Sequence, residues 1–402
     1  MLKPLFIACL FTFLSCKRES NSTPVMANQD QFEVQWKTPI SSGPYITGMN
    51  PVLFDSLVIM STEDNLHGKQ APILFIDSAN GSVIDTWDDY IDGSTWYWTD
   101  KYYQEGDYLM LQTMHSNDCL NLKTRQRQWA STTNQSQSAF VYGNAGYVYT
   151  SHHIGTKTAK VLRSPIDQKN WQTIYTFTAN GKMSPFFDGF GFGELPNGDE
   201  IVLWQNRSGS PLDRVEIFAY NISADTLLWR NRDFIGFDTP FSPKVFNGKV
   251  YGRFIGSVYC LDIETGETIW IKDLEPSFEH SFLPFGVVYL DYYHNQLIVH
   301  ANRDKLLYLN PDNGNIKSSF DGYPDGSGEG DFSEYQGKLY FTSSYQLVVT
   351  DILSGENLAS PAKLGVLNDI DIRSSITIDP ASGKLYFQDG YYLYCVKQPK
   401  NL

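Results

Sequence analysis

Short runs of alternating apolar and polar residues, each preceded by a turn, recur along the chain. Clear copies span residues 247–251 (NGKVY), 336–340 (QGKLY) and 382–386 (SGKLY). Fainter copies begin near residues 55, 105, 145, 197 and 295. Glycine tolerates the positive φ of tight hairpin turns, and a period of two is typical of a strand with one buried face. The pattern therefore predicts eight β-hairpins.

A second pattern follows the first. Its clearest copy runs from Cys260 through Asp262 and Gly266 to Trp270. Its anchors, spaced about 41–57 residues apart, lie at 77, 121, 164, 221, 262, 310, 351 and 396. A repeat of this length is typical of a four-stranded propeller blade. The sequence thus predicts an all-β fold, an eight-bladed β-propeller of four-stranded antiparallel blades over residues 31–402.

The repeat also assigns structural roles and a way to close the ring. Asp262 begins a turn that Gly266 completes. The last copy ends without an outer strand, whereas residues 32–36 form an orphan strand with Trp36. We expect this N-terminal strand to complete the eighth blade, because closure removes sheet edges that would aggregate. Three further tryptophans are expected to dock an outer strand on the next blade: Trp129, Trp229 and Trp270.

The N-terminus has the features of an export signal. Lys3 precedes an apolar run at 5–14, too short to span a bilayer, and Ser15 and Cys16 follow. This arrangement resembles a bacterial lipoprotein signal peptide of residues 1–15, with Cys16 as the lipidated residue and 16–30 as a polar tether. An ordinary secretory signal is the alternative. We expect an exported chain, lipid-anchored in the bacterial cell envelope, with the outer membrane as its location.

Three cysteines share one repeat position, in blades 2, 5 and 8: Cys119, Cys260 and Cys395. These blades lie far apart around a ring, whereas a disulfide needs Cα atoms within roughly 7 Å. We therefore expect buried thiols that stand in for a small residue.

Charge and composition exclude one class of partner. The net charge is −14, and Lys and Arg form no basic stripe along the sequence. The electrostatic signature of a nucleic-acid-binding protein is therefore missing. Aromatic residues make up 15% of the chain and charged residues 19%, a mixture that favours strands over disorder.

The residues Cys260, Asp262, Gly266 and Trp270 match four fixed positions of a known repeat. They resemble the tryptophan-docking repeat of pyrroloquinoline-quinone (PQQ) type propellers, Ala-x-Asp-x-x-x-Gly-x-x-x-Trp, with Cys for Ala. An eight-bladed PQQ-like ring behind a lipoprotein signal is similar to the BamB family, in which the propeller is a non-enzymatic scaffold of outer-membrane protein assembly. The resemblance implies a protein partner in the envelope, and it implies no cofactor.

Quinoprotein dehydrogenases of the same superfamily suggest an alternative. They bind PQQ and calcium in the central funnel and often carry two adjacent cysteines. This chain has no Cys-Cys pair, and no set of funnel carboxylates stands out. For an enzyme or sensor that binds PQQ and calcium, the basic loop residues to nominate are Arg253 and Arg303.

Loops between the second and third strands of the blades are expected to line one face and to present binding residues. Loops of this kind in four blades hold histidines: His67, His115, His152, His153 and His300. Imidazole is a common metal ligand. No His-x-x-x-His or Cys-x-x-Cys spacing supports a metal site, so we predict none and expect the histidines not to converge.

Two aromatic clusters complete the candidates. Trp96, Trp98 and Tyr102 would offer a rigid platform for a glycan or a protein, which makes a surface glycan-binding lipoprotein a second alternative. Packing between blades is the other interpretation, for these residues and for those at 186–192. No Gly-x-Ser-x-Gly, phosphate-binding or dinucleotide motif occurs. The main prediction is therefore a non-enzymatic binding scaffold.

Overall fold

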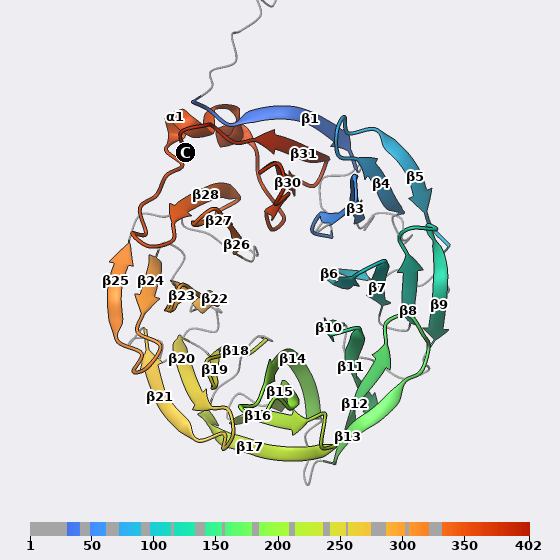
Figure 1. Ribbon diagram of the computed structural model, residues 1–402, viewed down its shortest axis with the longest axis vertical. Helices are drawn as coiled ribbons and strands as arrows, with labels where there is room; N and C mark the ends of the chain where they lie inside the picture. The colour runs from blue at the N-terminus through green and yellow to red at the C-terminus, as the bar shows by residue number, and fades with distance from the viewer. Residues whose placement is uncertain are drawn as a thin grey trace, which may run out of the picture.

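Eight antiparallel sheets stand around a ring, with the first strand of each innermost and the last outermost (Figure 1). The computed structural model describes residues 30–40, 49–61, 72–89, 97–113, 116–132, 141–154, 157–178, 185–208, 214–235, 242–254, 256–274, 287–301, 305–320 and 332–402. The side chains of a few strand residues in these ranges, Trp98 among them, are outside the description. The predicted all-β, eight-bladed propeller is confirmed.

The strands of each blade follow the chain in order. Blades 1 to 4 comprise β2 (Val52–Phe54), β3 (Leu57–Ser61), β4 (Ile73–Asp77) and β5 (Val83–Trp87); β6 (Tyr97–Glu105), β7 (Tyr108–Thr113), β8 (Ser116–Asn121) and β9 (Gln126–Thr132); β10 (Tyr142–Asn144), β11 (Tyr147–Ile154), β12 (Thr158–Pro165) and β13 (Gln172–Thr178); β14 (Pro185–Glu194), β15 (Glu200–Ser208), β16 (Arg214–Asn221) and β17 (Thr226–Ile235).

The remaining blades are built from later strands and one early strand. Blades 5 to 8 comprise β18 (Lys244–Phe246), β19 (Lys249–Phe254), β20 (Ser257–Asp262) and β21 (Thr268–Asp273); β22 (Val287–Tyr293), β23 (Gln296–Ala301), β24 (Lys305–Leu309) and β25 (Ile316–Phe320); β26 (Ser333–Tyr335), β27 (Lys338–Ser343) and β28 (Gln346–Asp351); β29 (Thr377–Ile378), β30 (Leu385–Gln388), β31 (Tyr392–Lys397) and β1 (Glu33–Pro39).

The ring closes through its N-terminal strand, as predicted. β1 pairs antiparallel with β31 from Glu33 opposite Lys397 to Pro39 opposite Tyr392. The first and last described segments therefore share one sheet. Because a paired strand offers no open hydrogen-bonding edge, closure satisfies the β31 backbone groups that would otherwise face solvent.

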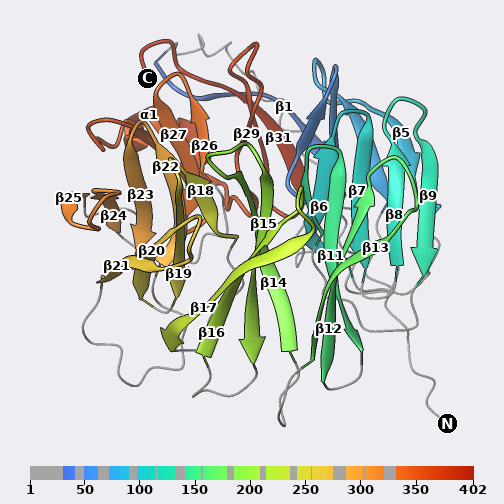
Figure 2. The same cartoon turned by 60° about the horizontal axis from the view of Figure 1, so that its bottom comes forward.

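The strands run between two faces of the ring (Figure 2). We call the end with the turns between first and second strands, and between third and fourth strands, the turn face. The turns at residues 55–56 and 78–82 lie there. The opposite end, where the second strands finish, is the loop face. β11 therefore ends at the loop face at Ile154, and β19 ends there at Phe254.

The turn that begins at Asp262 is fixed by its own side chain. Asp262 Oδ1 accepts the backbone N–H groups of Glu264 at 3.0 Å and Thr265 at 2.9 Å. The turn ends at Gly266, whose φ of +70° is a conformation that L side chains rarely adopt. Asp and Asn favour such turns because their short side chains can hydrogen-bond to nearby backbone.

Tryptophans dock one blade on the next, as the repeat predicted. Trp229 Nε1 donates to the Ile263 carbonyl at 2.8 Å, and its ring lies where a Cβ on Gly266 would stand. Trp270 and Trp129 donate likewise to turns in the following blades, at 3.0 and 2.8 Å. Trp36 of the closing strand donates at 3.2 Å to Ser78 in blade 1. The docking therefore also crosses the ring closure.

Blades 1 and 2 replace this aromatic contact with an ion pair. Asp85 lies opposite Phe75, the position that tryptophan takes in other blades. Arg125, at a φ of +57°, stands where four other blades have glycine and blade 4 has Asp225. Its guanidinium contacts Asp85 Oδ2 at 3.2 Å. A guanidinium extends across the gap that a tryptophan ring fills elsewhere.

Blade 7 has three strands, and its outer position is filled differently. An isolated bridge joins Thr350 to Asn357, and α1 (Pro361–Leu364) and the 3-10 helix η1 (Gly365–Asp369) follow. Elsewhere an outer strand docks on the third-to-fourth-strand turn of the next blade. In blade 8 this turn does not exist, because β31 and β1 come from opposite ends of the chain.

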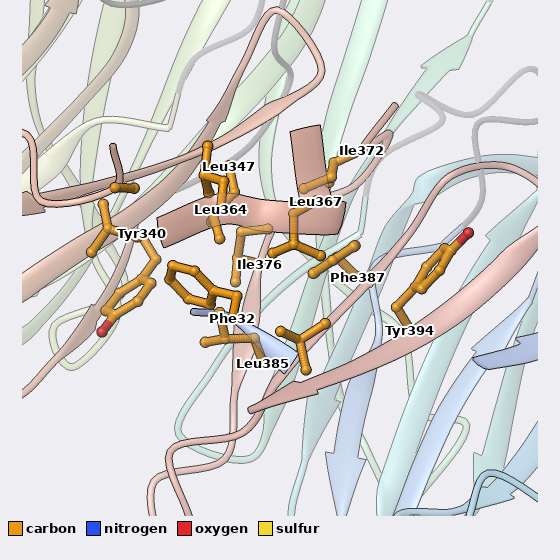
Figure 3. Packing of buried hydrophobic residues seen from close by; sticks show 13 residues of the cluster. Phe32, Tyr340, Leu347, Leu364, Leu367, Ile372, Ile376, Leu385, Phe387 and Tyr394 are labelled. Carbon is orange, nitrogen blue, oxygen red and sulfur yellow. The ribbon is translucent and has the colours of Figure 1, made fainter. Parts of the chain in front are cut away.

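The helical segment instead packs on the start of the closing strand (Figure 3). Phe32 is 3% exposed and lies in a cluster with Leu364 and Leu367. The Phe32 N–H donates to the Lys363 carbonyl at 2.9 Å, and Lys363 Nζ donates to the Asn401 carbonyl at 3.1 Å. We call Phe32, α1 and η1 the clasp. Together they join blade 7 to the N-terminal and the C-terminal segments of the chain that build blade 8.

The three repeat cysteines are buried free thiols, as predicted. Each lies directly opposite a docking tryptophan, Cys119 beside Trp129 for example. In blade 4 this position is Ala219, so cysteine serves as a small apolar residue. Burial raises the pKa of the Cys119 and Cys260 thiols to about 12.

We expect these thiols to resist alkylation in the folded protein. Only the thiolate reacts, and it is scarce at pH 8 when the pKa is about 12. The test uses a variant with Cys9→Ser and Cys16→Ser, treated with iodoacetamide at pH 8 and weighed by mass spectrometry. No label is expected in buffer and three labels in denaturant. Rapid labelling in buffer would contradict the burial.

Candidate binding site at the loop face

Several predicted residues lie outside the described part of the chain, so the structure does not place them: Cys16, His67, Trp96, His115 and Arg303. Trp98 belongs to β6, but its side chain is outside the description as well. The placed candidates come from four elements in blades 2, 3 and 5: Tyr102, His152, His153 and Arg253.

The described aromatic candidates pack between blades. Tyr102 lies opposite Leu111 and packs against the core of blades 1 and 2. In the second cluster, Phe187 and Phe190 are 0% and 1% exposed, and Phe192 packs against the same core. For these residues the packing interpretation is confirmed, and Tyr102 offers no open platform.

The two histidines occupy the loop end of β11. His153 Nδ1 lies 2.8 Å from the Pro185 carbonyl on β14 of blade 4. Because a carbonyl only accepts, the hydrogen of neutral His153 is on Nδ1. His152 lies opposite Lys160 on β12. Burial lowers the pKa of both histidines, that of His152 to about 4, to which His153 and Lys160 also contribute. Both rings are therefore neutral at pH 7.

His152 makes stability depend on pH in one window. Its pKa is about 4 in the folded chain and 6.5 in the unfolded chain, so the unfolded chain binds the proton first as the pH falls. The contribution is present above pH 6.5 and is lost towards pH 4, by at most about 3 kcal/mol. In urea titrations, wild type should lose more stability than His152→Gln between pH 7 and 4.5. Parallel losses would contradict this assignment.

Polar side chains are buried at the loop ends of the second strands in most blades. The middle of these strands is apolar, as in residues 58–60, 201–204 and 297–299. The loop-end polar layer consists of Ser61, Ser151, Gln205, Asn206, His300, Thr342, Ser343 and Gln388, all buried. Burying a polar group is costly unless it is hydrogen-bonded. These strands are therefore apolar in the core and polar where they reach the loop face.

Several of these groups hold neighbouring backbone in place. Ser151 Oγ donates to the Phe187 carbonyl at 2.8 Å, and Thr342 Oγ1 donates to the Ser374 carbonyl at 3.0 Å. Gln205 differs, since it is fully buried and neither side-chain polar atom has a partner within the described part of the chain. The loop end of blade 4 therefore keeps unused hydrogen-bonding capacity.

An ionic cluster lies at the same end of blade 4. Arg230 Nη2 contacts both carboxylate oxygens of Glu216 at 2.5 Å, and Arg232 Nε contacts Oε1 at 3.2 Å. Asn206 Nδ2 donates to Glu216 Oε2 at 3.0 Å. We call Arg230 and Arg232 the arginine pair. Their strand, β17, pairs with β16, which carries Glu216.

Aromatic rings hold one member of the pair in place. The Arg230 guanidinium lies 4.9 Å from the Phe177 ring of blade 3 and 5.0 Å from the Phe218 ring. Phe218 in turn stacks on Trp204 at 5.6 Å. This face of blade 4 is therefore turned towards blade 3. The arginine pair and His153 belong to the same inter-blade junction, at the loop face.

Sequence reasoning missed this cluster. The chain shows no basic stripe, because Glu216 and the arginine pair are separated in sequence and meet only through strand pairing. The sequence did contain a signal for the strand register. The repeat places Ala219 directly opposite Trp229, and this pairing fixes the partners of the neighbouring residues. That register places Phe218 opposite Arg230. Arg253, predicted as a funnel residue, lies one residue from the loop end of β19, opposite Val258.

Two kinds of feature are absent from the described ranges. No three side chains of His, Cys, Asp or Glu there lie together in a way that could hold a metal ion. Among the same residues, no helix has the length and apolar character needed to cross a membrane.

Known proteins resemble this chain in structure only. No protein-family model matches the sequence, and no curated protein matches it significantly. BamB from Moraxella catarrhalis has a TM-score of 0.57 at 10% identity, with 91% of this chain and 99% of BamB covered. The quinohemoprotein alcohol dehydrogenase ADHIIG from Pseudomonas putida HK5 has a TM-score of 0.62 at 12% identity, with 92% and 77% covered.

A designed protein and a second dehydrogenase complete the comparison. The computationally designed Ika8 protein has a TM-score of 0.64 at 12% identity, with 89% of this chain and 98% of Ika8 covered. A europium-containing methanol dehydrogenase has a TM-score of 0.57 at 10% identity, with 90% and 85% covered. Identities this low show a shared fold. The chain is an eight-bladed propeller with the PQQ-like fold that BamB and the quinoprotein dehydrogenases also have.

Proposed function

We propose that this protein is a non-enzymatic binding scaffold of the bacterial cell envelope, held by a lipid on Cys16, whose loop face binds a protein partner. The observation that carries the proposal is the loop end of blades 3 and 4. There a prearranged arginine pair and the neutral ring of His153 face the same inter-blade junction. Such groups suit recognition, because Arg and polar anchors supply much of the specificity in protein interfaces.

The path of the chain also favours the loop face as the binding surface. The tether joins the ring at Asp30, directly before the clasp, and β1 begins at the turn face. An anchor attached there leaves the loop face, at the other end of every strand, for the partner (Figure 2). No step of this proposal uses a quinone or a calcium ion.

Assembly of outer-membrane proteins is the finer proposal. It is supported by the fold shared with BamB and by an N-terminus that resembles a lipoprotein signal peptide. A partner from the assembly machinery, or a barrel protein under assembly, would then contact the loop face. Fold alone does not assign a function, so this part of the proposal depends on direct capture.

Site-specific crosslinking in cells tests the proposal. A photoreactive amino acid replaces Lys157, exposed at the loop face of blade 3, or Lys123, exposed at the turn face of blade 2. Adducts identified by mass spectrometry are expected from position 157, and the matched position 123 should not give them. Identical adducts from both positions, or none from either, would refute loop-face binding. Loss of membrane fractionation in Cys16→Ser tests the anchor separately.

A further inference from the structure

We infer that the arginine pair receives the carboxylate side chains of an acidic peptide segment, a conclusion about the partner's chemistry that rests on the proposed scaffold function. Two guanidinium groups meet one carboxylate at Glu216, so the cluster keeps a net positive charge within a chain of net charge −14. The Arg232 side chain is 53% exposed, whereas that of Glu216 is 15% exposed. The surplus charge is therefore presented to solvent.

Unpartnered donors lie on the same side of the blade. Trp204 Nε1 and Arg230 Nε are buried N–H groups with no hydrogen-bond acceptor in the described part of the chain. Trp204 lies opposite Phe218, and Phe218 opposite Arg230, on three adjacent strands. An indole and a guanidinium only donate. This side of blade 4 therefore has an excess of donors over acceptors.

A carboxylate suits the surplus positive charge that Arg232 presents to solvent. It only accepts hydrogen bonds, and it pairs with a guanidinium through two parallel bonds. The rings of Phe177 and Phe218 already hold the Arg230 guanidinium, so less side-chain entropy is lost when a ligand binds. A peptide with several carboxylates suits the site better than a single small acid, because Arg232 extends the positive surface outward.

The distribution of arginine supports this assignment. The chain has eleven arginines, and four lie in the strands of blade 4: Arg207, Arg214, Arg230 and Arg232. Arg207 lies near the loop end of β15, and Arg214 begins β16 at the same end. No other blade has more than two arginines within its described residues. Arginine is thus concentrated in blade 4. Seven acidic residues in the same described ranges leave the blade negatively charged as a whole, so the surplus positive charge is confined to the arginine pair.

Peptide binding to the full-length chain in detergent tests this inference. The probe is a short fluorescein-labelled peptide in which Glu alternates with Ser, and the control peptide carries Gln in place of Glu. Fluorescence anisotropy should show binding of the Glu peptide alone. Arg232→Ala should weaken it about tenfold, since a charge-assisted pair is lost. Glu216→Gln should tighten it, because the competing internal carboxylate is gone.

The matched control is Arg373→Ala. Arg373 is also an exposed arginine over an aromatic ring, 5.5 Å from that of Tyr345, but it lies between blades 7 and 8. Its loss should leave binding unchanged. Equal weakening by both alanine variants, or weakening by Glu216→Gln, would overturn the inference. Displacement by inorganic phosphate at a lower concentration than glutarate would identify a phosphate site and overturn it too.

The outcomes separate this inference from the scaffold proposal. Specific peptide binding together with no crosslinked partner would support the acidic-peptide site and refute the scaffold role. A crosslinked partner together with no peptide binding, and with capture unchanged by Arg232→Ala, would support the scaffold role and refute the acidic-peptide site.

Discussion

Gly266→Ala is expected to lower the free energy of unfolding by about 2–5 kcal/mol. Part of the loss is backbone strain, about 1–2 kcal/mol for an L residue at a φ of +70°. The rest arises because a Cβ at this position would lie 2.4 Å from the Trp229 ring. Relieving that overlap moves the docking tryptophan and its 2.8 Å hydrogen bond to Ile263, an overpacking cost of about 1–3 kcal/mol.

Gly248→Ala in the same blade is the matched control. Its φ is +71°, but the nearest atom to an added Cβ is 4.0 Å away, on Ile263. Only the backbone term, about 1–2 kcal/mol, is expected there. Urea unfolding followed by circular dichroism compares the two variants. Equal midpoints would show that blade docking adds nothing beyond turn geometry.

Phe32→Ala is expected to cost about 3–5 kcal/mol, the usual range for removing a buried aromatic side chain. Phe32 is 3% exposed and packs with Leu364, Leu367 and Leu385. Its loss removes apolar contacts from the clasp and from the strand that closes the ring. We therefore expect hydrogen exchange in β1 to accelerate, because the strand opens locally before the other blades unfold.

Two controls accompany Phe32→Ala. Phe32→Leu keeps most of the apolar volume and should cost less than about 1.5 kcal/mol. Ile84→Ala removes apolar atoms from a side chain that is 45% exposed, and it should change stability by at most about 0.5 kcal/mol. Wild-type stability and exchange in Phe32→Ala would show that the clasp does not secure closure.

The fold was predictable because the residues that define its repeat form local turns. Asp262, Gly266 and Trp270 each act within one turn or on the turn of the next blade, so their spacing survives in the sequence. Blade 7 could not be read in this way. Its α1 and η1 are held by tertiary contacts with Phe32, and helices this short have little stability of their own.

The candidate site was harder to predict because it also depends on contacts between residues that are distant in the sequence. The sequence named His152, His153 and Arg253 from their places near loops, and the structure does put them at loop ends of strands. It does not present Tyr102 as an open platform, because the Tyr102 ring on β6 packs against the core between blades 1 and 2. Glu216 and the arginine pair meet through strand register, which single residue types do not reveal.

The clasp also decides where mechanical load would enter the ring. Under the proposed anchorage, a pull from the membrane arrives at Asp30, two residues before Phe32. It first loads the Phe32 side chain and its backbone hydrogen bond to Lys363, and only then the ladder that begins at Glu33 and Lys397. The attachment point and the seam of the ring thus coincide. Membrane tension would strain the closure of the ring at blades 7 and 8, while the junction of blades 3 and 4 would carry little of the load.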